Sequence, residues 1–583
     1  MTTTPSAARS FPAQAPVDER GRLLHEGDAA AQLALCLANL ESLLAVAGQT
    51  PADLVEVEVR TTDARLLAEV CDVLTERLDA TGGHPRITVT EVEDLGDPGL
   101  FVVLGGTTSS IHPVPEGSSM SLETTLDSAT GSPAESLRGL CGGRVHLPGD
   151  PAYDVARVPW NVAVDQRPAA VAVPHTPAEV AEVVRAAAAA GLRVAPQSSG
   201  HNAAPLAEHG LDDVVLVRLH EMTGVSIDPE ARTARVVGGT LWRDVVAAAA
   251  PYGLAAMHGS SPDVAVAGYV LGGGLSWYAR RHGLAADSLT AVEVVTADGT
   301  LVRADAEHHV DLFWALRGGG GNLGVVTAIE LRLLPVPDVY AGMLLWDRER
   351  APEVVRTWAA WTRDLPESVT TSLRVMSFPP LPDLPPFLSG RQLVVVDGAV
   401  LEGDERAVEL LAPLRALAPE MDTFGRMPAA GLPEIHMDPP GPTPAVSDHA
   451  MLGRFGEEAV AALLAEVGPG TTTPLLFAEV RHLGGALGRP APGGGVLDHL
   501  PAAYALFCVA VAPVPEAAAA GLAAAARVVA ALAPWSVASR VLNFTERAVD
   551  ASSGYDGEAW ARLCRVRDAY DPTGVLLANH PLN

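Results

Sequence analysis

Three glycine-rich segments constrain this chain more than any other feature of its sequence. They are residues 196–202, residues 268–274 and residues 318–327. Glycine lets a backbone lie flat against a ligand, and the successive N–H groups of such loops form concave sites for anions. The formal net charge of the chain is −30 at pH 7, so its overall field repels anions. The sequence therefore predicts a phosphate-containing ligand that is held by local backbone dipoles.

Further short motifs follow one another in order between residue 145 and the C-terminus. They are Pro148-Gly149-Asp150, Tyr153, Trp160-Asn161, Gly200-His201-Asn202, Gly272-Gly273-Gly274, Arg281-His282-Gly283-Leu284-Ala285, Asp311-Leu312-Phe313-Trp314-Ala315-Leu316-Arg317-Gly318 and Tyr570-Asp571-Pro572. This set resembles the vanillyl-alcohol-oxidase superfamily, and specifically its berberine-bridge-enzyme-like branch. The resemblance implies an FAD-dependent oxidoreductase with a two-part FAD-binding domain of the PCMH type and an antiparallel-sheet cap domain.

The same resemblance implies how FAD is held. In this branch the histidine of the Gly-His-(Ser/Asn) loop is bonded to the 8α-methyl group of FAD, which assigns a covalent link to His201. Many relatives add a link through a cysteine one residue before a proline, where this chain has Ser261 before Pro262. Serine cannot form the thioether, so we expect a single link. The residues expected to contact FAD are Gln197, Ser198, Ser199, Gly200, His201, Asn202, Ser260, Ser261, Val264, Gly268, Gly272, Gly273, Asn322, Gly324, Val326 and Asn579.

Residues 8–107 have the pattern of a separate folding unit. Apolar residues recur at helical spacing from Leu33 to Ala47, and residues 54–61 alternate apolar and charged side chains as a half-buried strand does. Residues 66–78 predict a second helix, and residues 87–90 and 100–104 predict closing strands. The residues that match a known family are Gln14, Asp18, Gly21, Gly27-Asp28, Gln32, Asn39-Leu40, Gly48, Asp53-Leu54-Val55, Thr62-Asp63 and Pro85. They resemble the reactive-intermediate deaminase (Rid, YjgF-like) family, which implies a chorismate-mutase-like α/β domain.

One departure from the Rid pattern bears on the activity of this unit. Family members that hydrolyse imines carry an arginine two residues after the matching proline, where it clamps a carboxylate. This chain has Ile87 there, with Arg86 one residue early. On a strand, a shift of one residue turns the side chain to the opposite face. The substitution favours a role in assembly or stability over activity on 2-imino acids, and a homo-oligomer through this unit is expected by resemblance.

The whole chain is therefore expected to be an α+β multidomain protein. Its predicted parts are the Rid-like domain at 8–107, a linker rich in Ser, Thr, Pro and Gly at 108–144, the FAD-binding domain at 145–333, the cap domain at 334–534 and a segment at 535–583 that returns to the FAD-binding domain. Helices are expected at 177–190 and 241–249, and strands at 214–219, 292–296, 301–303, 327–333, 391–397 and 475–483.

The cap is expected to carry substrate specificity. In the strand at 475–483, period two places Glu479 and Arg481 on one face and His482 on the other. These residues form either an ion pair on a solvated face or a polar wall of the substrate pocket. A second polar island at 436–440 is placed to rim that pocket. Glu479 and His482 are the candidate bases that the cap offers.

Three further positions can be compared with the family pattern. Many relatives place a tyrosine base where this chain has Val541, which cannot take a proton from a substrate hydroxyl. Tyr269 stands where many relatives have a histidine beside the flavin, and we expect it to hydrogen-bond the ring. Val264 stands at the position that governs oxygen access, and a small aliphatic residue there favours O₂ as the electron acceptor.

Three functions remain open at this point. The first is oxidation of a C–N bond of a small metabolite, in secondary-metabolite biosynthesis, with a Rid-like domain that handles the imine or serves assembly. The second is oxidation of a C–OH group, with a base from the cap. The third is a flavoprotein scaffold without catalysis.

Composition excludes several other classes. The chain has no lysine, so a lysine Schiff base and pyridoxal-phosphate chemistry are excluded. It is acidic and has no arginine cluster, which argues against nucleic acid as a partner. Its five scattered cysteines lack metal-ligand spacing and favour reduced thiols, and no signal peptide and no run of about eighteen apolar residues is expected. These features predict a cytoplasmic protein with a small-molecule substrate and no membrane partner.

Overall fold

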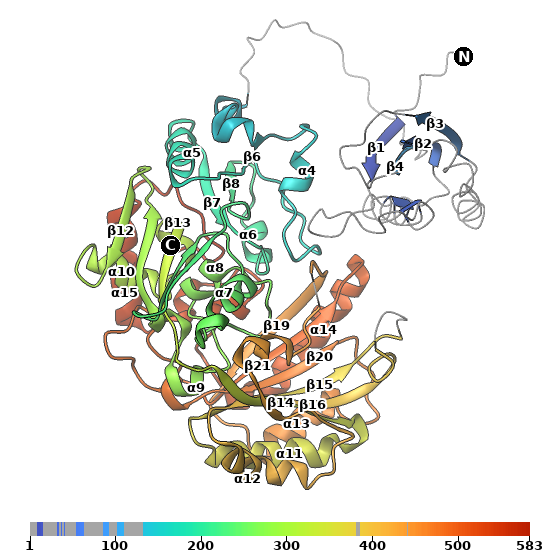
Figure 1. The fold of residues 1–583 in the computed structure, drawn as a ribbon, viewed down its shortest axis with the longest axis vertical. Coiled ribbons are helices and arrows are strands. Elements are labelled where there is room, and N and C mark those ends of the chain that lie inside the picture. Colours follow the sequence, from blue (N-terminus) through green and yellow to red (C-terminus); the bar gives the residue numbers. More distant parts are fainter. Residues whose placement is uncertain are drawn as a thin grey trace, which may run out of the picture. The chain divides into compact units, whose positions relative to one another are not determined.

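The computed structural model describes residues 8–14, 32–33, 36–37, 40, 54–62, 85–91, 102–109, 132–380, 385–439 and 441–582. By its internal contacts the chain divides into two units, Met1–Ser128 and Ala129–Asn583. Figure 1 shows the elements of both units, coloured along the sequence. Each unit has its own sheet structure and its own buried residues.

The N-terminal unit contains a four-stranded sheet in the order β1-β4-β2-β3. Its strands are β1 (Ala8–Gln14), β2 (Leu54–Thr61), β3 (Arg86–Glu91) and β4 (Val102–Ser109). β2 and β3 are parallel, and β4 is antiparallel to both β1 and β2. Helical residues Leu33, Cys36, Leu37 and Leu40 are fully buried, as their i, i+3, i+4, i+7 spacing predicts. The predicted strands at 54–61 and 87–90 are confirmed, and the helix predicted at 66–78 lies outside the described residues.

The predicted linker is wrong at both of its ends. β4 extends to Ser109 and pairs with β1 and β2, so the first unit includes residues assigned to the linker. At the other end, two short 3-10 helices at Pro133–Leu137 and Leu140–Gly143 belong to the second unit. Their buried residues Ala134, Leu137 and Cys141 pack in one core with helix α5 (Pro177–Ala189). Those apolar residues were hidden among small and polar ones in the sequence.

The predicted FAD-binding domain contains two sheets. The first has the order β5-β6-β8-β7, and β8 runs parallel to both β6 and β7. The second is antiparallel and has the order β12-β11-β13-β10-β9. The strands are β5 (Val145–His146), β6 (Ala170–Ala172), β7 (Arg193–Gln197), β8 (Val214–Arg218), β9 (Val225–Asp228), β10 (Thr233–Val237), β11 (Leu289–Val295), β12 (Leu301–Asp305) and β13 (Val325–Arg332).

Helices connect these strands close to the positions that the sequence predicted. α5 begins after Thr176, whose side chain accepts a hydrogen bond from the backbone of Glu179, with Pro177 at the first helical position. The other helices of this domain are α4 (Tyr153–Ala156), α6 (Ala204–Glu208), α7 (Trp242–Ala249), α8 (Val266–Leu271), α9 (Ala279–His282) and α10 (Val310–Leu316). The predicted helices at 177–190 and 241–249 and the predicted strands at 214–219, 292–296, 301–303 and 327–333 are all present within a few residues.

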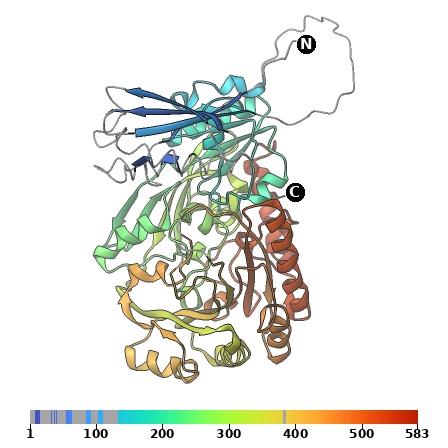
Figure 2. The same ribbon diagram turned by 90° about the vertical axis from the view of Figure 1, so that its right-hand side faces the viewer.

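The cap domain is a nine-stranded antiparallel sheet with helices on one face. Its path is β17-β14-β16-β15-β20-β21-β19-β22, with β18 paired to β14. The strands are β14 (Asp338–Asp347), β15 (Val369–Ser377), β16 (Gln392–Val400), β17 (Met421–Asp422), β18 (Gly425–Pro428), β19 (Ala445–Leu452), β20 (Phe477–His482), β21 (Tyr504–Val511) and β22 (Ser536–Val537). Helices α11 (Ala351–Trp361), α12 (Asp404–Arg415) and α13 (Glu457–Val467) lie on the side of this sheet away from the FAD-binding sheets, as Figures 1 and 2 show.

Alternation along the cap strands separates two faces. Leu373, Val396, Ala478 and Val480 belong to the core shared with the cap helices. The residues between them, including Asp397, therefore point to the opposite face. That face carries charged groups beside a smaller apolar cluster that includes Met376, Leu393 and Val395.

Helix α14 (Pro515–Leu532) corrects one expectation from the sequence. Over Pro515–Trp535 it is long and apolar enough, by length and composition alone, to cross a membrane, with a mean hydropathy of 1.6. The expectation that no such run exists is therefore wrong. α14 packs against β19 and β21 through a stripe of buried residues, Ala524, Ala525, Val528 and Leu532.

The C-terminal segment returns to the first sheet of the FAD-binding domain, as predicted. Leu576 forms an isolated parallel bridge with Val194 of β7. The carboxylate of Asp571 accepts hydrogen bonds from the backbone N–H groups of Val575 and Leu576 and fixes the turn before that bridge. Helix α15 (Gly557–Tyr570) lies beside α10 in Figure 1.

Candidate active site

The three glycine-rich segments meet in one trough. A cavity of about 150 Å³ is lined by residues of all three segments and by the C-terminal segment. A second cavity of about 360 Å³ continues from it towards the cap sheet. The two cavities share the lining residues Pro196, Gln197, Ser198, Asn202, Gly268, Asn543 and Asn579. The trough is thus an elongated site that begins at the glycine segments and ends under the cap.

Bare backbone makes part of this trough. Gly268, Gly320 and Gly321 line it, and a Cβ atom built on any of them would meet no heavy atom closer than 3.4 Å. Gly272 has a different requirement, because a Cβ there would lie 1.9 Å from Oδ1 of Asn543. Asn543 in turn donates a hydrogen bond from Nδ2 to the backbone oxygen of Tyr269. The open backbone fits a flat or phosphate-bearing ligand, and Asn543 fixes the floor beneath it.

His201 lies in the wall of the larger cavity, held by several contacts. Its ring stacks on Trp160 with centroids 4.0 Å apart, and its Nδ1 lies 2.9 Å from Oγ of Ser199. Its Nε2 lies 3.3 Å from Oδ1 of Asp263. Asp263 also accepts hydrogen bonds from Nε1 of Trp160 and Oγ of Ser261. Burial acts to raise the pKa of Asp263, but these three partners together hold that pKa below its usual value.

All of the residues expected to contact FAD line this trough, with the exception of Gly273. At Gly273 a Cβ would lie 2.8 Å from Leu497, so this glycine packs against its own chain instead. The side chains of Gln197 and Asn322 are also committed elsewhere. Gln197 pairs with Gln166 and Arg218, and Asn322 binds the backbone of Gly319, His580 and Leu582. Only the backbone of these two residues is available to a ligand.

Aromatic and aliphatic residues from the cap and the C-terminal segment form the far wall of the larger cavity. They include Phe477, Phe507, Val509, Val541 and Phe544. Phe507 and Phe544 pack edge to face with centroids 5.0 Å apart. Val541 lines the cavity with its side chain, so no hydroxyl is present at the position where the family's tyrosine base was expected. Val264 lines the same cavity.

Family comparison identifies the domain around the trough. Residues 168–305 match the family described as FAD binding domain. Residues 168–305 are an FAD-binding domain. Residues 11–102 match the family described as Endoribonuclease L-PSP, to which the predicted Rid-like unit corresponds. The chain thus joins an L-PSP domain to an FAD-binding domain, as the two resemblances predicted.

Curated relatives match only part of the chain. (R)-6-hydroxynicotine oxidase from Paenarthrobacter nicotinovorans is 35% identical over 205 residues, which is 35% of this chain and 44% of the relative. Xylooligosaccharide oxidase from Thermothelomyces thermophilus is 35% identical over 206 residues, which is 35% of this chain and 41% of the relative. The chain therefore spans less than half the length of these relatives.

Solved structures share the fold over a longer stretch. BBE-like 1 from Physcomitrella patens covers 78% of this chain with a TM-score of 0.66 and 22% identity, over 98% of its own length. 6-Hydroxy-D-nicotine oxidase from Arthrobacter nicotinovorans covers 75% of this chain with a TM-score of 0.65 and 23% identity, over 97% of its own length. The fold beyond the FAD-binding domain, including the antiparallel cap, is therefore that of the berberine-bridge-enzyme-like proteins.

The three predicted catalytic residues occupy different positions around the FAD-binding trough. Tyr269 lines the cavity, its ring meets Trp242 edge to face at 5.4 Å, and burial raises the pKa of its hydroxyl. Its hydroxyl makes no hydrogen bond with any residue that the structure describes. A tyrosine whose pKa is raised is a poor base, in agreement with the role of a ring contact.

Glu479 and His482 do not reach the substrate side of the cavity directly, and this corrects their assignment as bases. Glu479 is fully buried behind Arg481 and His436, which do line the cavity. His482 points to the helix-covered face, where its ring stacks on Tyr504 at 5.4 Å. It also lines a smaller void of about 30 Å³ that shares Ser260, Leu275 and Arg481 with the larger cavity. Burial lowers the pKa of His482 to about 3, so it is neutral at physiological pH.

One carboxyl group at the cavity was absent from the predicted set. Glu546, in the C-terminal segment, lines the larger cavity, and its Oε2 is buried without a hydrogen-bond partner among the described residues. Burial raises the pKa of this carboxyl to about 7, against a smaller lowering by Ser447. In the sequence, the one sign that Glu546 lies near the cavity was its position two residues after Phe544. Glu546 is a proton acceptor whose pKa lies in the range that general-base catalysis needs.

Proposed function

We propose that this protein is an FAD-dependent oxidase that removes hydride from the carbon of a C–N bond in a small amine. FAD bound in the trough supplies the two-electron acceptor for that hydride. The amine loses its hydride and a proton and becomes an imine, which water hydrolyses to a carbonyl compound and ammonia. O₂ is the proposed final electron acceptor, with Val264 at the cavity wall leaving room for its approach.

The single observation that carries this proposal is Glu546 in an aromatic cavity without a hydroxyl base. An amine is protonated in water and must lose that proton before hydride can leave. Glu546 can accept it at Oε2, because its pKa near 7 makes the carboxylate available at neutral pH. The rings of Phe477, Phe507 and Phe544 stabilise a nearby cation without hydrogen bonds.

The relative from Paenarthrobacter nicotinovorans supports the same direction, since its name describes oxidation of hydroxynicotine, an amine. The proposed attachment of FAD is one covalent link at His201. His201 lies in the cavity wall, and Ser261 stands where a second link would need a thiol. The local geometry supports this link, because the ring of His201 is held in place. It stacks on Trp160 and is hydrogen-bonded to Ser199.

Oxidation of a C–OH group is the second candidate. Several relatives are named as oligosaccharide oxidases at a similar level of identity. Glu546 is also a base for a hydroxyl, so the cavity does not depend on Val541 for this chemistry. The C–N reaction is preferred because a carboxylate of pKa near 7 matches an ammonium better than an alcohol of far higher pKa.

The proposed role of the L-PSP domain is assembly, with imine handling as the alternative. Ile87 and Arg86 are both exposed on β3, the edge strand of the sheet, and neither is held in a buried pocket in the described residues. A place in secondary-metabolite biosynthesis and a cytoplasmic location are likewise proposals.

One experiment tests the reaction class. The purified yellow protein is mixed without oxygen with a panel of small primary and secondary amines and a matched panel of alcohols and sugars. Bleaching of the flavin absorbance by amines alone supports the proposal. Bleaching by alcohols or sugars alone assigns the second candidate. If dithionite reduces the flavin but no compound of either panel does, the result argues for a flavoprotein scaffold without catalysis.

A further inference from the structure

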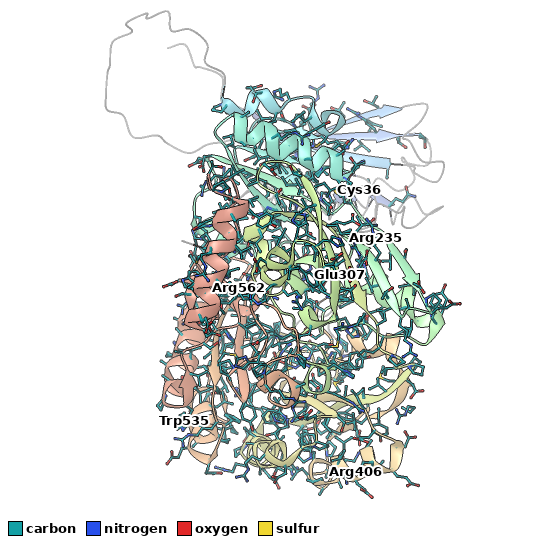
Figure 3. The ribbon with its side chains drawn as sticks, turned by 90° about the vertical axis from the view of Figure 1, so that its left-hand side faces the viewer. Cys36, Arg235, Glu307, Arg406, Trp535 and Arg562 are labelled. Carbon is teal, nitrogen blue, oxygen red and sulfur yellow. The ribbon has the colours of Figure 1, made fainter. Side chains whose placement is uncertain are left out.

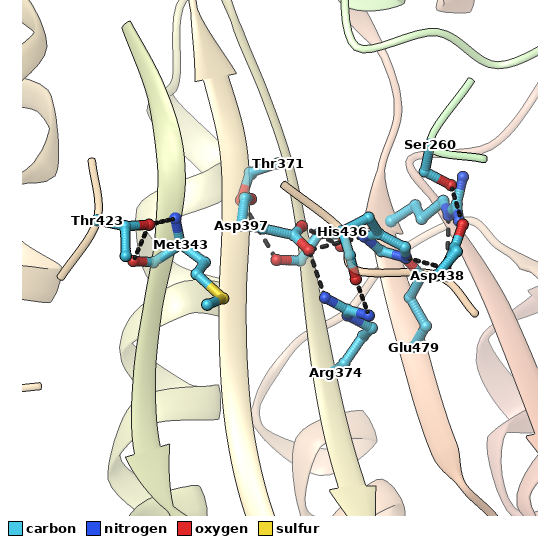
Figure 4. Close-up of polar contacts among 11 residues, drawn as sticks. Ser260, Met343, Thr371, Arg374, Asp397, Thr423, His436, Asp438 and Glu479 are labelled. Carbon is cyan, nitrogen blue, oxygen red and sulfur yellow. Dashed lines mark hydrogen bonds and ion pairs between the residues drawn. The ribbon is translucent and has the colours of Figure 1, made fainter. Parts of the chain in front are cut away.

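A line of acidic and basic side chains runs through the cap sheet on the face that meets the cavity. Nη2 of Arg374 lies 2.8 Å from Oδ2 of Asp397, and the same oxygen lies 2.7 Å from Nδ1 of His436. Nε2 of His436 lies 3.6 Å from Oε1 of Glu479, whose Oε2 lies 2.9 Å from Nε of Arg481. Figure 4 shows Arg374, Asp397, His436 and Glu479 of this line, which spans the neighbouring strands β16, β15 and β20.

The strand register explains why these groups meet. Arg374 of β15 stands directly opposite Glu479 of β20, and Ser372 stands opposite Asp397 of β16 on the other side. Oγ of Ser372 donates a hydrogen bond of 2.6 Å to Asp397, and Arg374 also donates to the backbone oxygen of His436. Asp397, Arg374 and His436 are thus hydrogen-bonded to one another across adjacent strands and a loop, and Glu479 lies within ion-pair distance of His436 and Arg481.

Burial of these charged groups costs folding free energy. Asp397 and Glu479 are 0% exposed and Arg374 is 2% exposed. Burying ions costs several kcal/mol each, and apolar residues of similar volume often give equal or greater stability. The physical reason for this line must therefore lie in what it orients. Its last member, Arg481, lines the cavity, as His436 does.

Arg481 is held rigidly but keeps free donors. Its Nε lies 2.9 Å from Oε2 of Glu479, an ion pair without hydrogen-bond geometry. Its guanidinium group lies over the ring of Phe544, with 5.1 Å between Cζ and the ring centroid. Within the described residues, Glu479 is the one carboxylate in ion-pair distance. The Nη1 and Nη2 groups carry four N–H bonds in a planar fork, which matches the two oxygens of a carboxylate.

We propose that Arg481 binds a carboxylate of the substrate, so that the enzyme acts on a small amine that also carries a carboxylate group. This inference rests on the proposed function and names its substrate class. The two acidic groups of the same cavity, Asp438 and Glu546, complement the ammonium end of such a zwitterion. Asp438 accepts a hydrogen bond from Ser260 and lies 3.9 Å from Nε2 of His436.

His436 acts as a positioning residue in this arrangement. Both of its ring nitrogens face carboxylates, with Asp397 at Nδ1 and Glu479 and Asp438 at Nε2. It therefore places Nε2 3.6 Å from Glu479, the carboxylate that lies beside Arg481. Trp277 covers the ring edge to face at 5.8 Å.

The test measures binding, not turnover. The oxidised holoprotein is titrated with benzoate and with benzamide, which has the same ring and no charge, and the flavin absorbance spectrum reports occupancy. We expect benzoate to bind more tightly than benzamide. Arg481→Gln should weaken benzoate roughly 10- to 100-fold, because a charge-assisted bidentate contact is lost, and should change benzamide by less than about twofold.

Two variants guard against a general loss of structure. Arg481→Lys keeps a charge beside Glu479 but loses the planar fork, so benzoate binding should fall to an intermediate value. His436→Gln should weaken benzoate and not benzamide. Arg406→Gln is the matched control, because Arg406 is an exposed residue of α12 that pairs with Glu409 (Figure 3). It should leave both titrations unchanged.

Equal affinity for benzoate and benzamide in the unmodified protein, no binding of benzoate, or unchanged benzoate binding in Arg481→Gln would overturn the proposal. The outcome is independent of the reaction class. Bleaching by amines combined with unchanged benzoate binding keeps the oxidase and removes the carboxylate site. Loss of benzoate binding in Arg481→Gln without bleaching by amines keeps the carboxylate site and removes the amine oxidase.

Discussion

Replacing Glu546 with glutamine should change the pH dependence of both stability and catalysis. The pKa of this carboxyl is raised from 4.5 to about 7 in the folded protein. Between these two pH values the folded protein holds a proton on Glu546 that the unfolded chain has released. Stability is therefore highest below pH 4.5 and falls as the pH rises to 7, above which it stays constant. At about 1.36 kcal/mol per pH unit, the loss is about 3 kcal/mol.

Glutamine carries no such proton, so Glu546→Gln should escape this loss. The unfolding temperature of the variant, followed by the flavin fluorescence of the holoprotein, should rise relative to the unmodified protein as the pH increases from 4.5 to 7.5. Glu307→Gln, at an exposed position labelled in Figure 3, is the control for removing a carboxylate far from the cavity. A difference between Glu546→Gln and the unmodified protein that does not vary with pH would refute the assignment of a raised pKa.

Catalysis supplies a second, independent measurement on the same variant. In the unmodified protein, kcat/KM for an amine should fall below about pH 7 as Glu546 is protonated. Loss of a general base should reduce the rate by about 10²- to 10⁴-fold in Glu546→Gln and remove that acidic limb. An acidic limb that survives in the variant would assign the base to another group.

Three further outcomes are expected. Acid precipitation should leave yellow colour on the unmodified protein and on Ser261→Ala, whereas His201→Ala should release all flavin; a colourless pellet from the unmodified protein contradicts the covalent link. Gly272→Ala should lower the FAD content of the purified protein, measured by the ratio of flavin to protein absorbance, because its Cβ would lie 1.9 Å from Oδ1 of Asn543; full flavin loading would show that the floor can shift. Removal of Met1–Ser128 should leave anaerobic flavin reduction by an amine unchanged and reduce thermal stability or change the oligomeric state; slower ammonia release with an unchanged oligomeric state would instead assign imine handling to the L-PSP domain.

The sequence by itself predicted most local elements and the segments that line the trough. The glycine segments predicted the trough because their backbone conformations do not depend on distant contacts. The helix α5 was predicted within one residue, since Thr176 and Pro177 mark its start and its apolar stripe has helical period. Period two also placed Glu479 and Arg481 on one face of β20 and His482 on the other.

The tertiary structure decided which face is functional and which residues meet. Nothing in β20 alone shows that the face of Arg481 meets the cavity, because that depends on which side of the sheet the cap helices cover. His436 lies in a loop and Asp397 in a strand, and their contact follows from the order β16-β15-β20. Glu546 lines the cavity because the chain, after the inserted cap domain, returns to the first domain in its C-terminal segment. Strand order, helix side and chain return depend on contacts between residues far apart in the sequence, and single-sequence patterns do not carry that information.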